Sequence, residues 1–239
     1  MDLGKQNILF FTRTMMLGGT ENVVLQLCEV FKPKVNKIVV CSCGGVNVEK
    51  LTEMGIRHYQ IPDISSKKDM FKICRTVKKI VEKEQITVIH SHHRMAAFYT
   101  EILFGSSIIK IANAHNTFFD KKLLTRFAYR NTKVIAVGKM VKKNLVDYFR
   151  IPEKQVSVIH NAVKPFDGDY IEDKYIRKLH DDGNFVVGNI GRLSEQKGME
   201  YFIEAIPKIL KKYPRTRFVI AGNGEDEHCL LYTSPSPRD

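Results

Sequence analysis

Short apolar runs alternate with helical patterns over the first 160 residues, and this alternation limits the fold more than any other feature. The helical pattern is clearest at residues 67–84, where apolar residues form one stripe and basic residues occupy other faces. Alternating strands and helices indicate an α/β fold with a doubly wound, largely parallel sheet, in which ligands bind at the carboxyl ends of the strands. The predicted strands are residues 7–13, 37–41, 57–61, 87–91, 108–113, 133–137 and 155–159.

The pattern breaks at residues 164–169, which have the composition of a linker. A charged segment follows at 171–182, and then a strand at 185–190, a turn at 191–198, a helix from 199 to about 212 and a strand at 217–222. We predict a complete N-terminal Rossmann-like domain at 1–165 and the start of a second α/β domain at 166–228. Two strands are too few to bury both faces of a parallel sheet, so we expect the second domain to be truncated.

The end of the chain differs from the rest. Residues 229–239 have neither a helical nor a strand pattern, and the closing residues resemble a translated sequencing adapter. We expect a non-native tail here, with a naturally disordered tail as the alternative.

Composition excludes several classes of protein. With 239 residues, 44% of them hydrophobic, the chain can build a real core. No apolar run approaches the roughly 18 to 20 residues of a membrane span, and the first strand begins without a signal-peptide layout, so we expect a cytoplasmic protein. The five cysteines are scattered and form no Cys-x-x-Cys pair, which favours free thiols over disulfides or a zinc site.

The formal net charge of +12 is concentrated in one segment. Between residues 121 and 146 there are eight basic residues and no acidic one. Such a segment can lie against an anionic membrane, bind nucleic acid, or simply form solvated helix faces. Nucleic acid is the weaker interpretation, because the sequence contains no recognised nucleic-acid module. The basic residues are Lys121, Lys122, Arg126, Arg130, Lys133, Lys139, Lys142 and Lys143.

The turn at residues 191–198 is a candidate anion site. Gly191 ends a strand, Arg192 and Lys197 add two cations, and a helix begins directly afterwards. A forked guanidinium, an ammonium and the positive end of a helix dipole can together bind a diphosphate. The alternative is a solvated turn with two ordinary surface cations.

A second glycine-containing turn, with Gly18 and Gly19, follows the first strand. Paired glycines allow a ligand to approach the backbone closely, although a tight turn without a ligand is the simpler interpretation. The spacing is not Gly-x-Gly-x-x-Gly, so there is no dinucleotide-binding fingerprint.

Histidines lie at the carboxyl ends of two predicted strands. His90, His92 and His93 end the fourth strand, and His115 ends the fifth. We predict that His115 makes a polar contact or transfers a proton, with a structural role in its loop as the alternative. His90 and His92 lie on one side of an extended segment, but no third ligand with a metal-binding spacing is visible, so we expect no metal.

Six motifs together resemble a family 4 (group 1) glycosyltransferase. They occur in family order between residues 7 and about 227, and each one alone is a weak signal. They are Gly18-Gly19-Thr20-Glu21, Val88-Ile89-His90-Ser91-His92, His115-Asn116-Thr117, Val158-Ile159-His160-Asn161-Ala162-Val163, Gly191-Arg192-Leu193 with Lys197-Gly198, and Ala221-Gly222-Asn223-Gly224-Glu225.

The resemblance implies the GT-B arrangement, two Rossmann-like domains with a cleft between them. It implies transfer of a sugar from a UDP- or GDP-linked donor to a glycan or lipid-linked acceptor, with retention of configuration, in cell-surface polysaccharide synthesis. No cofactor or metal is implied. By position, Arg192 and Lys197 match the pair that neutralises the donor diphosphate, Gly18 and Gly19 match the glycine loop at the cleft, and His115 matches the histidine near the transferred sugar.

Three departures from the family pattern are visible. Ala162 replaces the usual glycine of the linker motif, Gly138 stands where serine is common, and the later acidic donor-binding segment is missing. We therefore expect the chain as given to be inactive or nearly so. Two alternatives stay open: a sugar-nucleotide 2-epimerase of similar architecture, and a non-enzymatic basic module that binds membranes or nucleic acid.

Overall fold

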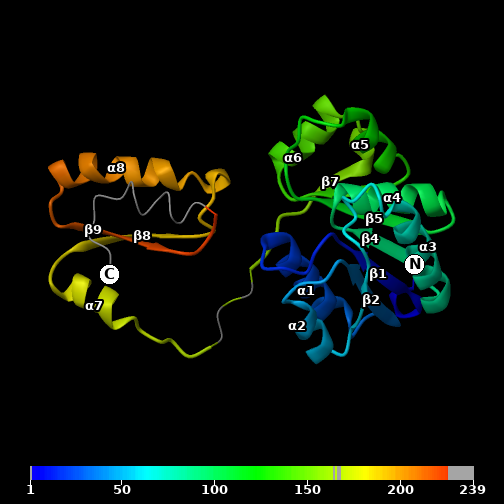
Figure 1. The fold of residues 1–239 in the computed structure, drawn as a ribbon, viewed down its shortest axis with the longest axis horizontal. Coiled ribbons are helices and arrows are strands. Elements are labelled where there is room, and N and C mark those ends of the chain that lie inside the picture. The colour runs from blue at the N-terminus through cyan, green and yellow to red at the C-terminus, as the bar shows by residue number, and fades with distance from the viewer. Residues whose placement is uncertain (1, 164, 166–167, 226–239) are drawn as a thin grey trace. The chain divides into compact units, whose positions relative to one another are not determined.

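The computed structural model describes residues 2–163, 165 and 168–225 (Figure 1). The chain separates into two compact units, Met1–Lys164 (unit 1) and Pro165–Asp239 (unit 2). The tail predicted at 229–239, and residues 164, 166 and 167 of the predicted linker, lie outside the described residues.

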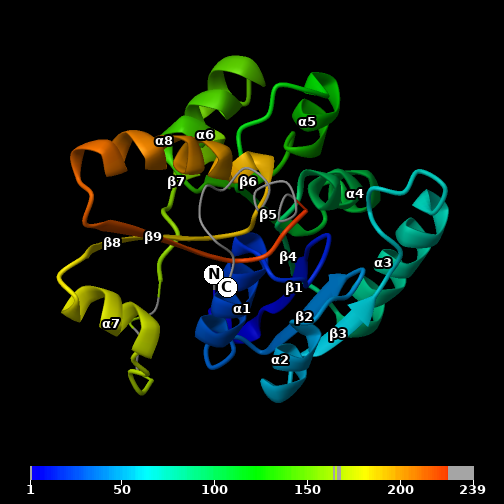
Figure 2. The same cartoon turned by 60° about the vertical axis from the view of Figure 1, so that its left-hand side comes forward.

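Unit 1 is built on a seven-stranded parallel sheet in the order β3-β2-β1-β4-β5-β6-β7, which confirms the predicted α/β class (Figure 2). All seven predicted strands are present, most of them one or two residues shorter than the sequence pattern indicated. They are β1 (Asn7–Phe11), β2 (Lys37–Ser42), β3 (Arg57–Gln60), β4 (Val88–Ser91), β5 (Ile109–Ala114), β6 (Lys133–Ala136) and β7 (Val156–Val158).

Helices connect these strands on both faces of the sheet (Figure 2). The helix predicted at 67–84 begins at Met70, and the helix after the first glycine turn begins within that turn, at Gly19. The helices are α1 (Gly19–Phe31), α2 (Val48–Glu53), α3 (Met70–Glu84), α4 (Arg94–Phe104), α5 (Lys122–Ala128) and α6 (Lys139–Lys143), the last continued by a π-helical segment, Asn144–Tyr148. Short 3-10 turns lie at Leu3–Lys5 and Glu153–Gln155.

The strand β1 shows how the sequence builds the core. All five of its residues are buried, and successive side chains point to opposite faces of the sheet. Leu9 and Phe11 pack with residues of α3 and α4, whereas Ile8 and Phe10 pack with residues of α1 and α2. A central strand covered on both sides must be apolar throughout, which is why its sequence is a continuous apolar run.

Glu84, the last residue of α3, is a buried acid that holds one edge of the sheet. Its carboxylate accepts hydrogen bonds from Tyr59, Lys37 and Arg57, and its residue is only 3% exposed. Hydrogen bonds, the strongest from the Tyr59 hydroxyl and the others from the two cations, lower the pKa of Glu84 to about 2, although burial opposes this shift. The group is therefore ionised at neutral pH and ties α3 to β2 and β3.

Unit 2 contains two parallel strands, β8 (Phe185–Ile190) and β9 (Thr216–Ala221), joined by the helix α8 (Met199–Lys212). The segment that the sequence showed only as charged contains a further helix, α7 (Lys174–Asp181), which Asp173 caps by accepting from the Tyr175 and Ile176 amides. A 3-10 turn, η4 (Glu195–Lys197), precedes α8. Within the described part of the chain, no helix is both long and apolar enough to cross a membrane.

Candidate functional site

The carboxyl ends of β4 and β5 bring three histidines together. These strands are parallel neighbours, with His90 of β4 opposite Ile111 of β5. His92 follows the last residue of β4, and His115 follows the last residue of β5. Because parallel strands end at the same edge of the sheet, histidines 23 residues apart in the sequence become neighbours.

The three imidazoles form a continuous cluster in which His90 and His92 are buried and His115 is half-buried. The rings of His90 and His92 lie 4.4 Å apart, and those of His92 and His115 lie 5.5 Å apart and are stacked. His90 Nε2 donates to Asn113 Oδ1 at 2.8 Å, and His92 Nδ1 lies 3.3 Å from His115 Nε2. The ring of Phe10 in β1 packs against two of these imidazoles, with its centroid 5.4 Å from that of His90 and 5.8 Å from that of His92.

Burial keeps this cluster uncharged. Loss of hydration lowers the pKa of His90 to about 4 and lowers the pKa of His92 well below its ordinary value. Burial also lowers the pKa of His115, although the Glu21 carboxylate opposes part of that effect. A neutral His115 at pH 7 has one N–H donor and one acceptor, so it can bind polar groups of a ligand without adding charge.

The histidine cluster does not have the composition of a metal site. Among the described residues there is no group of three or more histidine, cysteine, aspartate or glutamate side chains placed to hold a metal ion. In addition, His90 Nε2 is hydrogen-bonded to Asn113, and His92 Nδ1 is hydrogen-bonded to His115. The expectation that the protein needs no metal stays a prediction.

The glycine turn lies at the same edge, after β1. Gly18 precedes the first residue of α1, Gly19, and Thr14 Oγ1 donates to Glu21 Oε1 at 2.5 Å across the turn. Gly18 has an extended backbone with φ −178°, which any residue can adopt. A Cβ on Gly19 would meet no atom within 4 Å. A Cβ on Gly18 would lie 2.4 Å from Oε2 of Glu21, whose Oε1 accepts from Thr14, so packing within the turn favours glycine at position 18. The fold does not require glycine at position 19, and open space beside the backbone is the reason that explains it.

Gly45, in the loop that follows β2, packs against the backbone of this turn. It was not singled out in the sequence. Its φ is +147°, and a Cβ there would lie 2.4 Å from the Met15 carbonyl carbon. The amide of Asn47 donates to the Met15 carbonyl at 2.8 Å, and its Nδ2 donates to the Met16 carbonyl at 2.6 Å. Close backbone contact thus fixes the path of residues 13–18. The pair Gly44-Gly45 after the second strand was the available signal.

Two further polar groups at this edge, Arg13 and Asp63, were not predicted from the sequence. Arg13 forms a bidentate ion pair with Asp63, in which Nε donates to Oδ1 at 3.1 Å and Nη2 donates to Oδ2 at 2.8 Å. This contact lowers the pKa of Asp63 to about 2. His93, which was grouped with the other histidines, instead caps α4 by accepting from the Met95 amide at 3.1 Å. His93 therefore serves as the N-cap of α4 and is not part of the histidine cluster.

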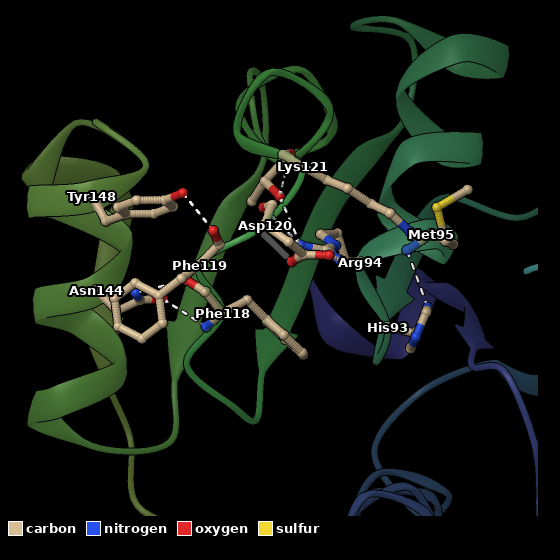
Figure 3. A network of polar contacts seen from close by, with 10 residues as sticks. His93, Arg94, Met95, Phe118, Phe119, Asp120, Lys121, Asn144 and Tyr148 are labelled. Atoms are coloured by element: carbon tan, nitrogen blue, oxygen red, sulfur yellow. Dashed lines mark hydrogen bonds and ion pairs between the residues drawn. The ribbon is translucent and has the colours of Figure 1, made fainter.

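The loop that follows His115 is fixed by contacts to α4 and to the π-helical segment (Figure 3). Arg94 donates to Asp120 Oδ1 at 2.8 Å and lies over the Phe118 ring at 4.8 Å. Asn144 brackets Phe118, because its Oδ1 accepts from the Phe118 amide and its Nδ2 donates to the Phe118 carbonyl. The Tyr148 hydroxyl donates to the Phe119 carbonyl at 2.6 Å.

The turn at residues 191–198 in unit 2 has a fixed backbone. The Gly191 amide donates to the Ala221 carbonyl and the Leu193 amide to the Asn223 carbonyl, each at 3.0 Å. Leu193 is buried with Met199 and Ile203 of α8. Arg192 and Lys197 are both exposed on this anchored turn. Gly198, with φ +61°, leads into α8. The first amides of α8, which have no side-chain cap among the described residues, can receive an anion.

Two glycines of the last motif are required by close packing. A Cβ on Gly222 would lie 1.8 Å from the Gly191 carbonyl oxygen, and one on Gly224 would lie 2.0 Å from the Leu193 carbonyl oxygen. Side chains at these positions would push the two strand ends apart. Glycines at 222 and 224 therefore hold the backbone that presents Arg192.

The sheet order of unit 1 and the polar groups at its carboxyl edge define a Rossmann-like α/β unit of the ligand-binding kind. The family model "Glycosyltransferase Family 4" matches residues 17–165, and the model "Glycosyl transferases group 1" matches residues 171–234. The chain belongs to Glycosyltransferase Family 4, as the sequence motifs indicated.

Similar proteins agree with this family. The chain is 28% identical over 227 residues, 87% of its length and 46% of the relative, to one of the subunits of human phosphatidylinositol N-acetylglucosaminyltransferase. It is 25% identical over 191 residues, 67% of its length and 48% of the relative, to alpha-monoglucosyldiacylglycerol synthase of Acholeplasma laidlawii. The chain thus spans about half the length of these curated relatives.

Solved structures show the same fold. The Anabaena protein HepE in complex with UDP-glucose superposes with a TM-score of 0.73 at 18% identity, covering 95% of this chain and 64% of that one. A UDP-GlcNAc 2-epimerase from Methanocaldococcus jannaschii superposes with a TM-score of 0.53 at 12% identity, covering 90% of this chain and 65% of that one. These neighbours confirm the GT-B fold class, and an epimerase shares it.

Proposed function

We propose that this chain is part of a retaining glycosyltransferase that moves a sugar from a nucleotide-diphosphate donor to a lipid or lipid-linked acceptor. The match of two glycosyltransferase models, one in each unit, carries the proposal. Arg192 and Lys197 bind the donor diphosphate, and His115 contacts the transferred sugar. Gly18 and Gly19 leave room for ligand beside the backbone of unit 1.

The anchored turn of unit 2 supports the diphosphate assignment. Arg192 and Lys197 are solvent-exposed cations on a backbone fixed by hydrogen bonds and by the buried Leu193. A bound diphosphate would receive two charge-assisted contacts and the uncapped amides of α8. Because HepE binds UDP-glucose, UDP is the first donor nucleotide to test, and GDP is the second.

The test is calorimetry of the 239-residue chain with UDP and with GDP. Replacing Arg192 or Lys197 with alanine should weaken binding by about 1.5 to 3 kcal/mol, the range for hydrogen bonds to charged groups. Lys208→Ala is the matched control, because Lys208 is an exposed lysine of α8, the helix that follows the turn. Equal affinities for the parent and both site variants would remove the pair from the donor site.

The relatives favour a lipid acceptor. The names of two of them contain phosphatidylinositol and diacylglycerol, both of which are membrane lipids. An enzyme with such an acceptor must reach the membrane surface. We therefore infer peripheral binding at the cytoplasmic face, in the synthesis of a cell-surface glycan.

The surface around α5 has the chemistry for that contact. Phe119 and Leu123 are 72% and 80% exposed, and Lys121, Lys122 and Arg126 are exposed beside them; we call these five residues the α5 surface. Exposed apolar side chains among cations suit an anionic lipid surface, where each basic residue contributes about 1 kcal/mol. The contacts of Arg94 and Tyr148 hold the backbone of this surface in place (Figure 3).

Co-sedimentation with vesicles tests the contact. Binding should be strong with phosphatidylglycerol, weak with phosphatidylcholine, and steeply reduced by salt. Lys122→Gln with Arg126→Gln should weaken binding by about 2 kcal/mol, or roughly thirty-fold, if each cation contributes about 1 kcal/mol. Lys174→Gln with Lys178→Gln, which removes two exposed lysines of α7, is the control. Equal sedimentation with neutral and anionic vesicles would contradict the proposal.

The two alternatives make different predictions. An epimerase would change the sugar of UDP-GlcNAc without an acceptor, and its fold is compatible with this chain. A basic binding module would show salt-sensitive binding to lipid or nucleic acid and no affinity for UDP. The family models favour glycosyl transfer over both, because one matches residues 17–165 and the other matches residues 171–234 in unit 2.

A further inference from the structure

The distance between His92 and His115 does not show which of the two contacting nitrogens carries the proton. Both rings are neutral, so one nitrogen of the pair, at 3.3 Å, must carry a proton and the other must accept it. The choice determines which nitrogen of His115 can donate to a ligand.

The environment of the other nitrogen of His92, Nε2, shows where the proton of His92 lies. His92 is only 2% exposed, and its Nε2 is fully buried without a hydrogen-bond partner among the described residues. If Nε2 carried the proton, a buried N–H donor would have no acceptor. Orphaned buried N–H groups are rarer in proteins than under-satisfied acceptors. The proton therefore belongs on Nδ1, where His115 accepts it.

The consequence passes to His115. If His92 Nδ1 donates to His115 Nε2, the neutral His115 must carry its own proton on Nδ1. The neighbouring His90 does not compete for this contact, because its Nε2 donates to Asn113 Oδ1 at 2.8 Å. Burial of all three rings lowers their pKa values and keeps a second proton off the cluster.

We propose that His92 is a positioning residue that fixes the tautomer of His115, so that His115 presents Nδ1–H as a hydrogen-bond donor. With a proton already on Nδ1, His115 can donate to a hydroxyl or ester oxygen of a bound sugar nucleotide, and it cannot accept a proton through that nitrogen. The identity of the oxygen rests on the proposed function, whereas the tautomer itself does not.

Long-range ¹H–¹⁵N NMR of the labelled 239-residue chain measures the tautomer directly. His115 Nδ1 and His92 Nδ1 should both show shifts of the protonated, pyrrole type, and both Nε2 atoms should show the unprotonated, pyridine type. His115→Ala identifies the His115 signals by their loss. A pyridine-type Nδ1 in His115 would overturn the inference.

Two substitutions at His92 provide a matched pair. In His92→Asn the amide nitrogen can occupy the position of Nδ1 and still donate to His115, so the His115 tautomer should be kept. In His92→Gln the amide lies near the position of Nε2, so the preference should be lost. Circular dichroism checks that both variants fold. A His115 tautomer unchanged in a folded His92→Gln variant would show that His92 does not set it; if that variant does not fold, the parent spectrum decides.

Titration with UDP-glucose separates this inference from the proposed function. Movement of the His115 Nδ1–H signal on addition of the nucleotide sugar is the expected result. A protonated Nδ1 with no response to UDP-glucose would keep the tautomer assignment and count against the sugar contact. A His115 signal that moves with UDP-glucose while Nδ1 is unprotonated would support the sugar contact and contradict the tautomer assignment.

Discussion

Unit 1 and unit 2 follow the same strand–helix–strand pattern but differ greatly in how much core they build. In unit 1, β1 is buried along its whole length between helices on two faces. In unit 2, the described residues include one small core cluster, Leu193, Met199 and Ile203. Phe185 at the start of β8 is 72% exposed, and Ile190 at its end is 86% exposed.

The difference shows that a local pattern does not stabilise a unit unless neighbouring elements cover it. Ile89 in β4 has strands on either side and is fully buried, whereas Ile190 in β8 has one neighbouring strand, β9, among the described residues. Burial of an aliphatic side chain contributes roughly 1.5 to 3 kcal/mol, and Ile190 forgoes most of that. We therefore expect unit 1 to supply most of the stability and unit 2 to open first.

The largest expected effect comes from removing a core side chain in unit 1. Ile89→Ala should cost near the upper end of about 2 to 5 kcal/mol, because the surrounding strands cannot collapse into the cavity. Ile203→Ala in α8, at 4% exposure, should cost near the lower end, because the small cluster around it can relax. Native-state hydrogen exchange measures the opening free energy in each unit separately. Equal losses would break the comparison.

A smaller effect is expected at the close contact in unit 2. Gly222→Ala places a Cβ 1.8 Å from the Gly191 carbonyl oxygen at a φ of +153°, and the backbone angle alone costs about 1 to 3 kcal/mol. The pairing of β8 with β9 should be lost while unit 1 stays folded. Gly188→Ala, in β8 with open space around its Cβ, is the control. Protected β9 amides in the Gly222 variant would show that the contact can relax.

The smallest effect concerns acid. The pKa of Glu84 is lowered from 4.5 to about 2 in the folded state, so its contribution is complete above about pH 4.5 and is lost as the pH falls through about 2. Glu84→Gln should lower the unfolding free energy of unit 1 by about 1.5 to 3 kcal/mol at pH 7, and by much less near pH 2. Glu82→Gln, an exposed neighbour on α3, is the control. A penalty that does not change with pH would contradict the assigned role.

Chemical denaturation at several pH values gives this measurement. The substitution leaves Lys37 and Arg57 without a charged partner at this position, but their side chains are 40% and 62% exposed and can be hydrated. The difference between parent and variant therefore reports mainly the buried carboxylate.

Sequence periodicity predicted the strands because a strand buried on both faces must be a continuous apolar run, as β1 is. It did not reveal helix α7, whose eight residues are polar enough to look like a charged loop. It also grouped His93 with His90 and His92, although His93 caps α4. Neighbouring positions at a strand end point in different directions, and only the backbone path shows which side chains meet.

The sequence by itself determined the α/β class and the family, and it placed His115, Arg192 and Lys197 in candidate roles that still need testing. Local periodicity and motif order are properties of neighbouring residues, so they can be read without a structure. Only the tertiary structure decided that His92 touches His115 and that Gly45 supports the turn at residues 13–18. These contacts join segments that are far apart in the chain, and their register is fixed by the pairing of β1, β2, β4 and β5.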